Sequence, residues 1–473
     1  MRATGFLVHF NGCRTAEERQ KSPSGTTINQ YRFTIDNVSE NGFQRYCKIG
    51  KTLAEGAHTV VLDVEDSTGA SQGHFEQTIN IKDRLIVSIG DSYGSGEGNP
   101  DIPRVWAYES VGGQLQRVVK SEAQWVDKRC HRSATAGPAQ AALDLEYSDP
   151  HSSVTFFSLA CSGATINTPD PDKPENGSGL LGPYIGAEPG ATPNPPMLPP
   201  QVDQLKEIVG VKGEAGSRTI DSLVISIGGN DMQFVKIIME CTLSIDCYNV
   251  HAIKGRLDAR RAELPGRYDD LAVALQTVPT DKIYVTEYPN LTLQDSGAFC
   301  GTNSTWWNEP LMLGVTQPEV SWMYNNLLVP MNREIMPAAA ARHGWTFVGG
   351  VMNPFGVTGQ PPGYGYCAND TWLRRSSESV EMQGPNNRLE TKGLLHPNAR
   401  GHEVYRSRIL PAITGAAALA GPTYSTSLNA LGYTSSVSNG WITGACNTSG
   451  QCTSGVAVMK LTIADPDGVA TSR

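Results

Sequence analysis

The first part of the chain alternates apolar and polar positions in short runs. Gln30 to Ile35 and His58 to Val64 are two such runs, and turns rich in Gly, Asn and Asp separate them. Alternation with a period of two is typical of strands that bury one face. Residues 1–82 are therefore predicted to form an all-β module.

A different pattern begins at Arg84, because Leu85 to Ile89 is a short run that is almost wholly apolar. Strands of this kind are expected where helices cover both faces of a parallel sheet. Similar runs recur downstream, with helix-compatible stretches between them, and together they predict a doubly wound α/β domain over residues 83–415. The later runs are Val154–Leu159, Ser222–Ile227, Lys282–Thr286 and Trp345–Val348, and the helical stretches include Ala136–Tyr147 and Arg256–Thr277.

Two stretches interrupt this alternation and are predicted to be long loops, of the kind that often builds or covers a site. They are Thr168–Pro200, which is rich in Pro and Gly, and Phe355–Arg388, which is rich in Gly, Asn and Ser. From about Ala416 onward small and hydroxylated residues dominate. Residues 416–473 are predicted to be a small β-rich C-terminal appendage, which either folds alone or completes the N-terminal module.

The composition narrows the class of protein. A chain of 473 residues exceeds what one hydrophobic core usually serves, so two or three units are expected. The formal charge of −9 and the absence of a dense Lys/Arg run argue against a nucleic-acid partner. No run approaches the roughly 18 to 20 apolar residues of a transmembrane helix, and the opening residues lack the charged start and apolar core of an export signal.

Cysteine usage nevertheless indicates an exported protein, secreted or periplasmic. The ten cysteines are even in number and fall into neighbouring couples, as in a disulfide framework. Zinc is the competing use, but it favours C-x2-C pairs with further ligands at matched spacing, which do not occur here. The predicted disulfides are Cys13–Cys47, Cys130–Cys161, Cys241–Cys247, Cys300–Cys367 and Cys446–Cys452.

The first apolar strand of the α/β region leads directly into candidate chemistry. It runs into the segment Gly90 to Gly98, which places Ser92 at the carboxyl end of a parallel strand, where ligands bind in open α/β sheets. Glycines permit a tight turn that exposes the hydroxyl, and the N–H groups of the next helix can hold negative charge. The alternative is an ordinary glycine-rich turn or a phosphate cradle, although this segment lacks the Lys of a P-loop and contains a carboxylate.

Three further blocks follow in a distinctive order. Ala160 to Thr165 comes after the second strand, Gly228 to Asp231 after the third, and His396 to His402 near the end of the α/β region. Together with the Ser92 block they resemble the SGNH family of GDSL-type hydrolases over roughly residues 84–412. The cysteine-bearing segments Cys130 to Ser133 and Leu159 to Gly163 resemble an extracellular, disulfide-bearing branch of that family. The resemblance implies a three-layer α/β sandwich with a central parallel sheet.

The resemblance also implies roles for individual residues. Ser92 would be the nucleophile and His396 the general base that takes its proton and returns it to the departing alcohol. The oxyanion hole would consist of the backbone N–H groups of Ser92 and Gly163 and the side-chain amide of Asn230. No cofactor and no metal is implied.

The third member of the triad departs from the family pattern. The family usually has Asp three residues before its histidine, whereas Gly393 to Leu395 precede His396 here. We expect a backbone carbonyl to orient the imidazole, as in some members of the resembling branch. The open alternative is a carboxylate from elsewhere, with Glu390 and Asp370 as candidates.

Other polar residues of these blocks have a structural interpretation. Asp91 and Asp231 are expected to accept hydrogen bonds from backbone amides of their turns. His402 is expected to be structural, on the final helix. His131 could contact the substrate, but beside a predicted disulfide it is as well suited to brace the first helix.

The sequence therefore predicts a secreted hydrolase of acyl esters, in lipids, small esters or acylated polysaccharides. A carbohydrate O-acetylesterase is the neighbouring alternative, with the β module holding the enzyme on a polysaccharide. The segment Glu55 to Gly69 resembles the strand, turn and strand of immunoglobulin-like modules on secreted enzymes. A non-catalytic extracellular binding or adhesion protein is the alternative from a different class, and the intact Ser92, Gly163, Asn230 and His396 argue against it.

Overall fold

The structure is a computed structural model, and it folds into two compact units. One unit comprises Met1–Arg84, Leu145–Thr155 and Ala417–Arg473, and the other comprises Leu85–Asp144 and Phe156–Ala416. The division into 1–82, 83–415 and 416–473 stays a prediction. The structure describes residues 5–13, 28–148, 153–171, 174–188, 196–244, 246–302, 315–384 and 392–415, and the strands 434–438, 441–446 and 460–464.

The first unit is built from two antiparallel sheets. One has the strand order β14-β15-β16-β1-β4 and the other β3-β2-β5-β6. In the first sheet β16 pairs with β1, so the C-terminal segment adds strands to the N-terminal module. The strands are β1 (Phe6–Asn11), β2 (Ile28–Ile35), β3 (Val38–Ser39), β4 (Lys48–Leu53), β5 (Gly56–Asp66), β6 (Ser71–Ile81), β14 (Thr434–Ser438), β15 (Trp441–Cys446) and β16 (Lys460–Ala464).

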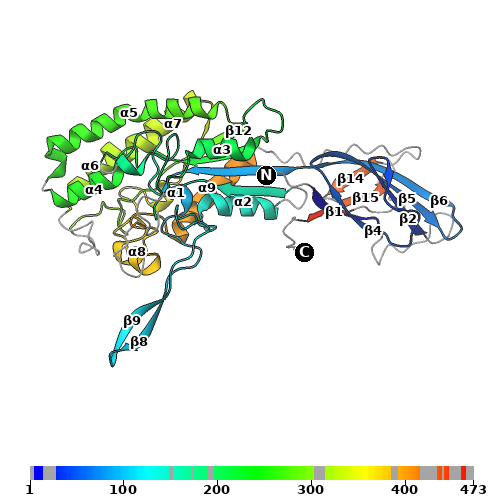
Figure 1. The fold of residues 1–473 in the computed structure, drawn as a ribbon, viewed down its shortest axis with the longest axis horizontal. Helices are drawn as coiled ribbons and strands as arrows, with labels where there is room; N and C mark the ends of the chain where they lie inside the picture. Colours follow the sequence, from blue (N-terminus) through cyan, green and yellow to red (C-terminus); the bar gives the residue numbers. More distant parts are fainter. Residues whose placement is uncertain are drawn as a thin grey trace. The chain divides into compact units, whose positions relative to one another are not determined.

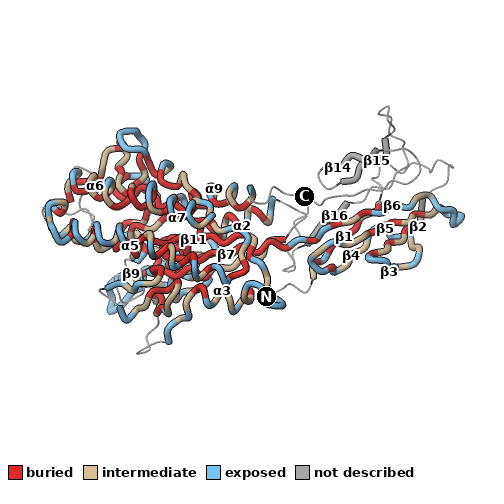
Figure 2. Tube along the Cα trace, turned by 90° about the horizontal axis from the view of Figure 1, so that it is seen from above, coloured by how far each residue is buried: buried red, intermediate tan, exposed pale blue. Residues whose placement is uncertain are grey.

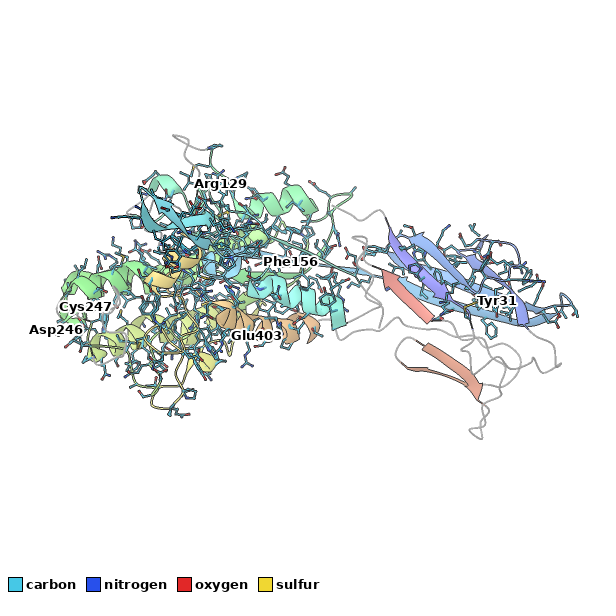
Figure 3. All side chains as sticks on the ribbon, turned by 90° about the horizontal axis from the view of Figure 1, so that it is seen from below. Tyr31, Arg129, Phe156, Asp246, Cys247 and Glu403 are labelled. Carbon is cyan, nitrogen blue, oxygen red and sulfur yellow. A yellow bond between two sulfur atoms is a disulfide. The ribbon has the colours of Figure 1, made fainter. Side chains whose placement is uncertain are left out.

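Buried side chains from both sheets form a single hydrophobic core. Phe10 from β1, Phe33 from β2 and Leu62 from β5 belong to this core and are almost completely inaccessible. Tyr31, labelled in Figure 3, is a further member. The alternation of buried and accessible residues along β5 follows the period of two read from the sequence. The immunoglobulin type of this unit stays a prediction.

The second unit contains a five-stranded sheet with the order β10-β7-β11-β12-β13. The pairs β7–β11, β11–β12 and β12–β13 are parallel, which confirms the predicted α/β class with a central parallel sheet. All residues of β7 are buried, and Figure 2 shows β7 and β11 as largely buried strands. The strands are β7 (Asp83–Gly90), β10 (Ser153–Ser158), β11 (Ile220–Ser226), β12 (Thr280–Thr286) and β13 (Thr346–Val348).

Helices cover both faces of this sheet. In Figure 1, α2 and α9 lie on one side of the sheet and α3, α5 and α7 lie on the other. Among the described residues, none of the helices has both the length and the apolar character to cross a membrane. The helices are α1 (Ser92–Ser95), α2 (Gly137–Ser148), α3 (Gln201–Val209), α4 (Phe234–Leu243), α5 (His251–Leu275), α6 (Gln317–Met323), α7 (Met336–Arg342), α8 (Ser376–Met382) and α9 (Ala399–Gly415), with π-helical turns η4 (Tyr324–Leu328) and η5 (Pro330–Ile335) between α6 and α7.

The strand order places a topological switch point beside β7. In chain order the strands are arranged second, first, third, fourth and fifth, so the chain leaves β7 toward β10 on one side and returns to β11 on the other. Ligands of open α/β sheets bind at such a point, outside the carboxyl ends of the strands. Ser92 follows β7 at this end of the sheet.

A two-stranded hairpin extends from the second unit and was not predicted from the sequence. It consists of β8 (Val105–Val111) and β9 (Gln114–Ser121), joined by Gly112 and Gly113 (Figure 1). Arg117 lies over the ring of Trp106 and pairs with Glu381 of α8 at 2.5 Å. The hairpin is therefore fixed to α8 by polar contacts of Arg117 and of the Trp106 ring N–H with Glu381.

Candidate active site

The turn after β7 places Ser92 at the first position of α1. Asp91 caps this helix by accepting a hydrogen bond from the N–H of Tyr93. Gly90 has φ of 130°, and a Cβ at this position would lie 1.9 Å from the carbonyl oxygen of Ser226. Only glycine fits this turn, because a side chain would be both strained and in collision with the neighbouring strand. The side-chain amide of Gln201 bonds both the N–H and the carbonyl of Gly90, which fixes the turn further.

The structure brings Ser92 and His396 into contact across 304 positions of the chain. Nε2 of His396 lies 2.7 Å from Oγ of Ser92, and Nδ1 lies 2.9 Å from the carbonyl oxygen of Leu394. In the tautomer that fits both contacts, Nδ1–H donates to Leu394 and Nε2 accepts the proton of Ser92. This is the geometry of a hydroxyl nucleophile beside an oriented base.

The loop before His396 has an unusual backbone that supports this geometry. Leu395 has φ of 65°, in the left-handed region that non-glycine residues rarely adopt. Its carbonyl oxygen accepts a hydrogen bond from the Tyr93 hydroxyl at 2.9 Å, and its N–H donates to the carbonyl of Arg374. Strain of this kind persists where surrounding contacts hold the backbone in place, and it concentrates at functional sites.

The described carboxylate candidate for a third triad member is engaged elsewhere. Asp370 is exposed and pairs with Arg400 at 2.6 Å. Glu390 lies outside the described residues. The group that faces Nδ1 of His396 is the backbone carbonyl of Leu394, as expected from the absence of Asp before the histidine.

Asp91 holds the backbone of its own turn, and Asp231 holds the backbone of the loop after β10. Asp91 accepts from the N–H of Tyr93 at 3.0 Å, and Asp231 accepts from the N–H of Ile166 at 3.1 Å. Asp231 also pairs with the buried Arg267 at 3.0 Å. Burial raises the pKa of Asp91 to about 7, although its hydrogen bonds favour the ionised form. Both residues brace the site, as the sequence predicted for short acidic residues in turns.

Gly163 lies in the loop after β10, where its backbone has φ of 86°. A Cβ at this position would lie 2.2 Å from the hydroxyl of Tyr184, which donates to the carbonyl of Ser162 at 2.6 Å. Glycine is therefore required by the backbone conformation and by the close aromatic residue.

Hydrogen-bond donors line the same groove as the serine and the histidine. The groove has a volume of about 650 Å³ and is lined by Ser92, Gly163, Asn230 and His396, among others. In the described part of the chain, the N–H groups of Ser92 and Gly163 donate no hydrogen bond to protein atoms. One N–H of the Asn230 amide donates to the carbonyl of Ala164 at 2.9 Å, which leaves its second hydrogen for a ligand.

A buried network of charges lies next to the Ser92–His396 pair, and it was not predicted from the sequence. Glu97 Oε2 lies 2.6 Å from Nδ1 of His131, and Nε2 of that ring lies 2.8 Å from Glu188. The amide of Gln383 donates to Glu97, and Trp125 stacks on the imidazole with ring centroids 4.6 Å apart. His131 thus joins the segment after the nucleophile to the wall of the groove.

The charges of this network shift the pKa values of its members. Burial opposes the ionisation of Glu97, but the adjacent His131 outweighs it and lowers the pKa of Glu97 to about 2. Burial also opposes the charged form of His131, but Glu97 and Glu188 raise its pKa to about 9. The pair is therefore ionic at neutral pH. The sequence signal for this ion pair was Glu97, a carboxylate in the glycine-rich turn after Ser92.

The same network acts on the base. Burial lowers the pKa of His396 below its ordinary value, and the negative charge of Glu97 opposes this shift. The imidazole is therefore neutral at pH 7, as a general base must be. Glu97 favours the imidazolium that forms when His396 takes a proton.

His402 has a structural environment on α9. It is buried, and its Nδ1 accepts a hydrogen bond from the N–H of Gly137 at 3.3 Å. Burial lowers the pKa of His402 to about 3. The residue therefore joins α9 to the start of α2, in agreement with the structural role expected from its position.

Four of the five predicted disulfides are present. They are Cys13–Cys47, Cys130–Cys161, Cys241–Cys247 and Cys300–Cys367. The fifth, Cys446–Cys452, stays a prediction, because Cys452 lies outside the described residues. Cys130–Cys161 joins the position beside His131 to the loop that carries Gly163. Among the described residues no group of three or more His, Cys, Asp or Glu could hold a metal ion.

Comparison with known proteins gives similarity in structure only. No protein-family model and no curated protein matches the chain. An extracellular lipase from Streptomyces rimosus aligns with 20% identity over 71% of this chain and 99% of its own, with a TM-score of 0.41. A phospholipase A1 from Streptomyces albidoflavus has 19% identity, coverage of 70% and 98%, and a TM-score of 0.38.

A carbohydrate acetylesterase family member from Sinorhizobium meliloti has 11% identity, coverage of 72% and 100%, and a TM-score of 0.29. The resemblance to SGNH-type hydrolases therefore rests on the four sequence blocks. Because the identities and TM-scores are low, the geometry of the site carries the functional proposal.

Proposed function

We propose that the chain is a secreted serine hydrolase that cleaves carboxylic esters. The observation that carries this proposal is the 2.7 Å separation of Ser92 Oγ and His396 Nε2, with the second ring nitrogen held by the Leu394 carbonyl. Both groups line a groove of about 650 Å³, within the usual size of small-molecule sites.

The reaction proceeds through an acyl-enzyme intermediate. Ser92 Oγ attacks the acyl carbon while its proton passes to Nε2 of His396. The bond between the acyl carbon and the alcohol oxygen then breaks, and the alcohol leaves with that proton. Water attacks the acyl group on Ser92 with His396 again as base, which releases the carboxylic acid and restores the hydroxyl.

Three donors stabilise the oxyanion in both steps. They are the N–H groups of Ser92 and Gly163 and the side-chain amide of Asn230, which come from three different loops at the edge of the sheet. Donors that are fixed before the reaction stabilise the developing charge without reorganisation. The Ala164 carbonyl orients the amide for this purpose.

Secretion is supported by the four disulfides of the described residues. Disulfides persist in oxidising compartments and are rare in reducing ones. We assign the N-terminal unit to the immunoglobulin-like type on the basis of its two antiparallel sheets around a common core.

Labelling with a fluorophosphonate probe tests the proposed nucleophile. The wild-type protein is expected to be labelled and to hydrolyse p-nitrophenyl butyrate, and Ser92→Ala to lose both properties. Ser110→Ala, in the exposed β8–β9 hairpin, is the matched control and should retain both. An unlabelled and inactive wild-type protein, or an active Ser92→Ala variant, contradicts the proposal.

A further inference from the structure

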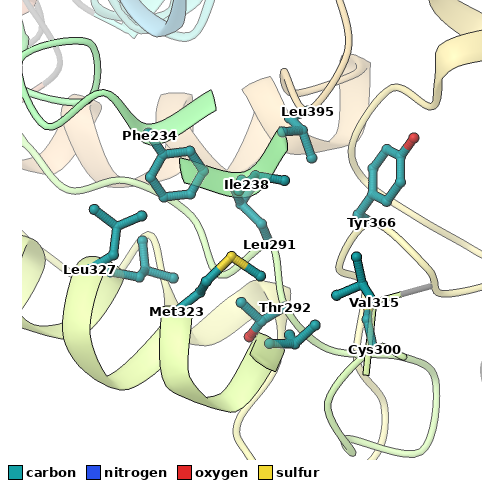
Figure 4. A pocket seen from close by; sticks show the side chains of 12 residues that line it. Phe234, Ile238, Leu291, Thr292, Cys300, Val315, Met323, Leu327, Tyr366 and Leu395 are labelled. Atoms are coloured by element: carbon teal, nitrogen blue, oxygen red, sulfur yellow. The ribbon is translucent and has the colours of Figure 1, made fainter. Parts of the chain in front are cut away.

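An apolar pocket lies beside the groove that contains Ser92. Twelve side chains line it, and Figure 4 shows that they converge on a common space. Phe234 and Ile238 come from α4, Leu291 from the loop after β12, and Met323 and Leu327 from the helix that runs through α6 and η4. The walls therefore consist mainly of hydrocarbon and sulfur.

Polar groups at the wall of the pocket are engaged with protein partners. The Thr292 hydroxyl donates to Oδ1 of Asn290 at 2.6 Å. Cys300 is bonded to Cys367. A ligand in this pocket thus meets an apolar surface, which suits a hydrocarbon chain and disfavours a sugar.

The pocket and the catalytic groove share part of their walls. Phe234, Leu291, Leu328 and Leu395 line both spaces. Leu395 directly precedes His396 in the chain. The pocket therefore lies directly against the apolar wall of the catalytic groove, next to the base.

The helix on the far side of the pocket has a local irregularity. The turns η4 and η5 are π-helical, and Leu327 and Leu328 lie in the first of them. Pro330 in the same helix lacks the N–H that a regular turn would use. Single π turns in helices are frequent at functional sites, and here they shape the wall against which the ligand would lie.

We propose that this pocket binds the hydrocarbon chain of the acyl group, so that the enzyme prefers medium-chain over acetyl esters. This inference rests on the proposed ester hydrolysis at Ser92. The pocket has a volume of about 50 Å³. A water molecule requires about 10–15 Å³ of such space, so about four groups of that size fit. With the acyl carbon and its neighbour in the groove, this corresponds to acyl chains of about six carbons.

The dependence of kcat/KM on chain length tests the pocket. Wild-type rates on p-nitrophenyl esters should rise by about fourfold for each methylene that the pocket buries, and then fall once the pocket is full. The series runs from acetate through butyrate, hexanoate and octanoate to palmitate. A maximum at acetate, with no rise toward hexanoate, overturns the proposal.

Substitutions on one helix separate filling of the pocket from general damage. Ile238→Trp should lower the ratio of kcat/KM for hexanoate to kcat/KM for acetate by at least about tenfold, the loss of two buried methylenes. Leu243→Trp is the matched control, because Leu243 lies on the same helix and is 84% exposed. It should change neither rate.

Met323→Ala provides the opposite test and does not depend on inserting a bulky ring. Removal of this side chain lengthens the pocket, so the preferred ester should shift to a longer chain. If acetate is hydrolysed and Ser92 is labelled, but neither variant changes the chain-length profile, the pocket proposal fails alone. If no ester is hydrolysed and Ser92 is not labelled, the proposed function itself fails.

Discussion

The carbonyl oxygen of Leu394 accepts a hydrogen bond from Nδ1 of His396 at 2.9 Å. In serine hydrolases with a complete triad, a carboxylate occupies this place and holds the imidazole in the tautomer whose Nε2 accepts the proton. A backbone carbonyl fixes the same tautomer without a side chain. It stabilises the imidazolium less than a carboxylate would. Two buried charges act on the base from a distance: Glu97 raises the pKa of His396, and His131 lowers it.

Loss of Asp370 is expected to leave catalysis intact. Asp370→Asn removes an exposed ion pair with Arg400, which contributes at most about 1 kcal/mol to stability. The kcat for p-nitrophenyl hexanoate should stay within about twofold of wild type, because the Leu394 carbonyl still orients His396. A fall on the order of 10⁴, as when the orienting Asp of a triad is lost, shows instead that a carboxylate orients the base.

The amide of Asn230 is expected to act mainly on the transition state. Asn230→Ala should lower kcat by about 10²–10³, which corresponds to about 3–4 kcal/mol, with little change in KM. Asn230→Asp has the same shape, but its negative charge repels the oxyanion, so it should be at least as damaging. Steady-state kinetics on folded variants measure both values, and a KM effect without a kcat effect contradicts the assignment.

The pH profile should report the neutral state of His396. Burial lowers its pKa below the ordinary 6.5, so kcat/KM should rise with pH along an acid limb whose midpoint lies below 6.5. Glu97 raises this pKa. Glu97→Gln should therefore move the midpoint to a lower pH and also reduce the limiting rate.

Glu122→Gln is the control for that experiment, because Glu122 is a partly exposed carboxylate paired with Lys128. Its profile should match that of the wild type. An unchanged or raised midpoint in Glu97→Gln, with the fold intact by circular dichroism, shows that Glu97 exerts no field on the base.

His131 is expected to be a large contributor to stability. His131→Ala leaves Glu97 buried without its cationic partner, and loss of one partner of a buried pair costs about 3–5 kcal/mol. Guanidinium unfolding of both proteins at neutral pH measures the difference. A loss below about 1 kcal/mol, the size of an ordinary surface substitution, contradicts the buried ion pair.

The pH dependence of stability provides a second test of this pair. The pKa of His131 is raised from 6.5 to about 9, so its contribution is complete below 6.5 and is lost as the pH rises through 9. The pKa of Glu97 is lowered from 4.5 to about 2, so its contribution is complete above 4.5 and is lost as the pH falls toward 2. The difference in unfolding free energy between wild type and His131→Ala should be largest between pH 4.5 and pH 6.5, where both contributions are complete.

The α/β class and the serine–histidine contact could be predicted because both depend on short local patterns. Ser92 and His396 follow from blocks that recur in a fixed order around one edge of a sheet. The network of Glu97, His131 and Glu188 could not be predicted, since nothing in the spacing of three isolated residues shows that they meet in the interior. The hairpin β8–β9 had a local signal, Gly112–Gly113 between alternating residues, which is typical of a tight turn.

The absence of Asp before His396 predicts an orienting backbone carbonyl, but the sequence does not tell which residue provides it. Every residue has a carbonyl, and only the positive φ of Leu395 turns that of Leu394 toward the ring. The apolar pocket could not be predicted from the sequence either. Its residues Phe234 and Ile238, and likewise Met323 and Leu327, have the i, i+4 spacing of any buried helix face. Only the packing of the helices decides that a space remains between them.

Leu395 contributes to the site through both its side chain and its backbone, which limits the substitutions that this position tolerates. Its side chain lines both the catalytic groove and the proposed acyl pocket. Its backbone carbonyl, held by the Tyr93 hydroxyl, belongs to the loop that positions His396. Substitution of Leu395 is therefore expected to change the choice of ester and the rate of turnover together. Substitution of Ile238 or Met323, which line the pocket but not the groove, is expected to change the choice of ester alone. Those sites offer freedom to adapt without disturbing proton transfer.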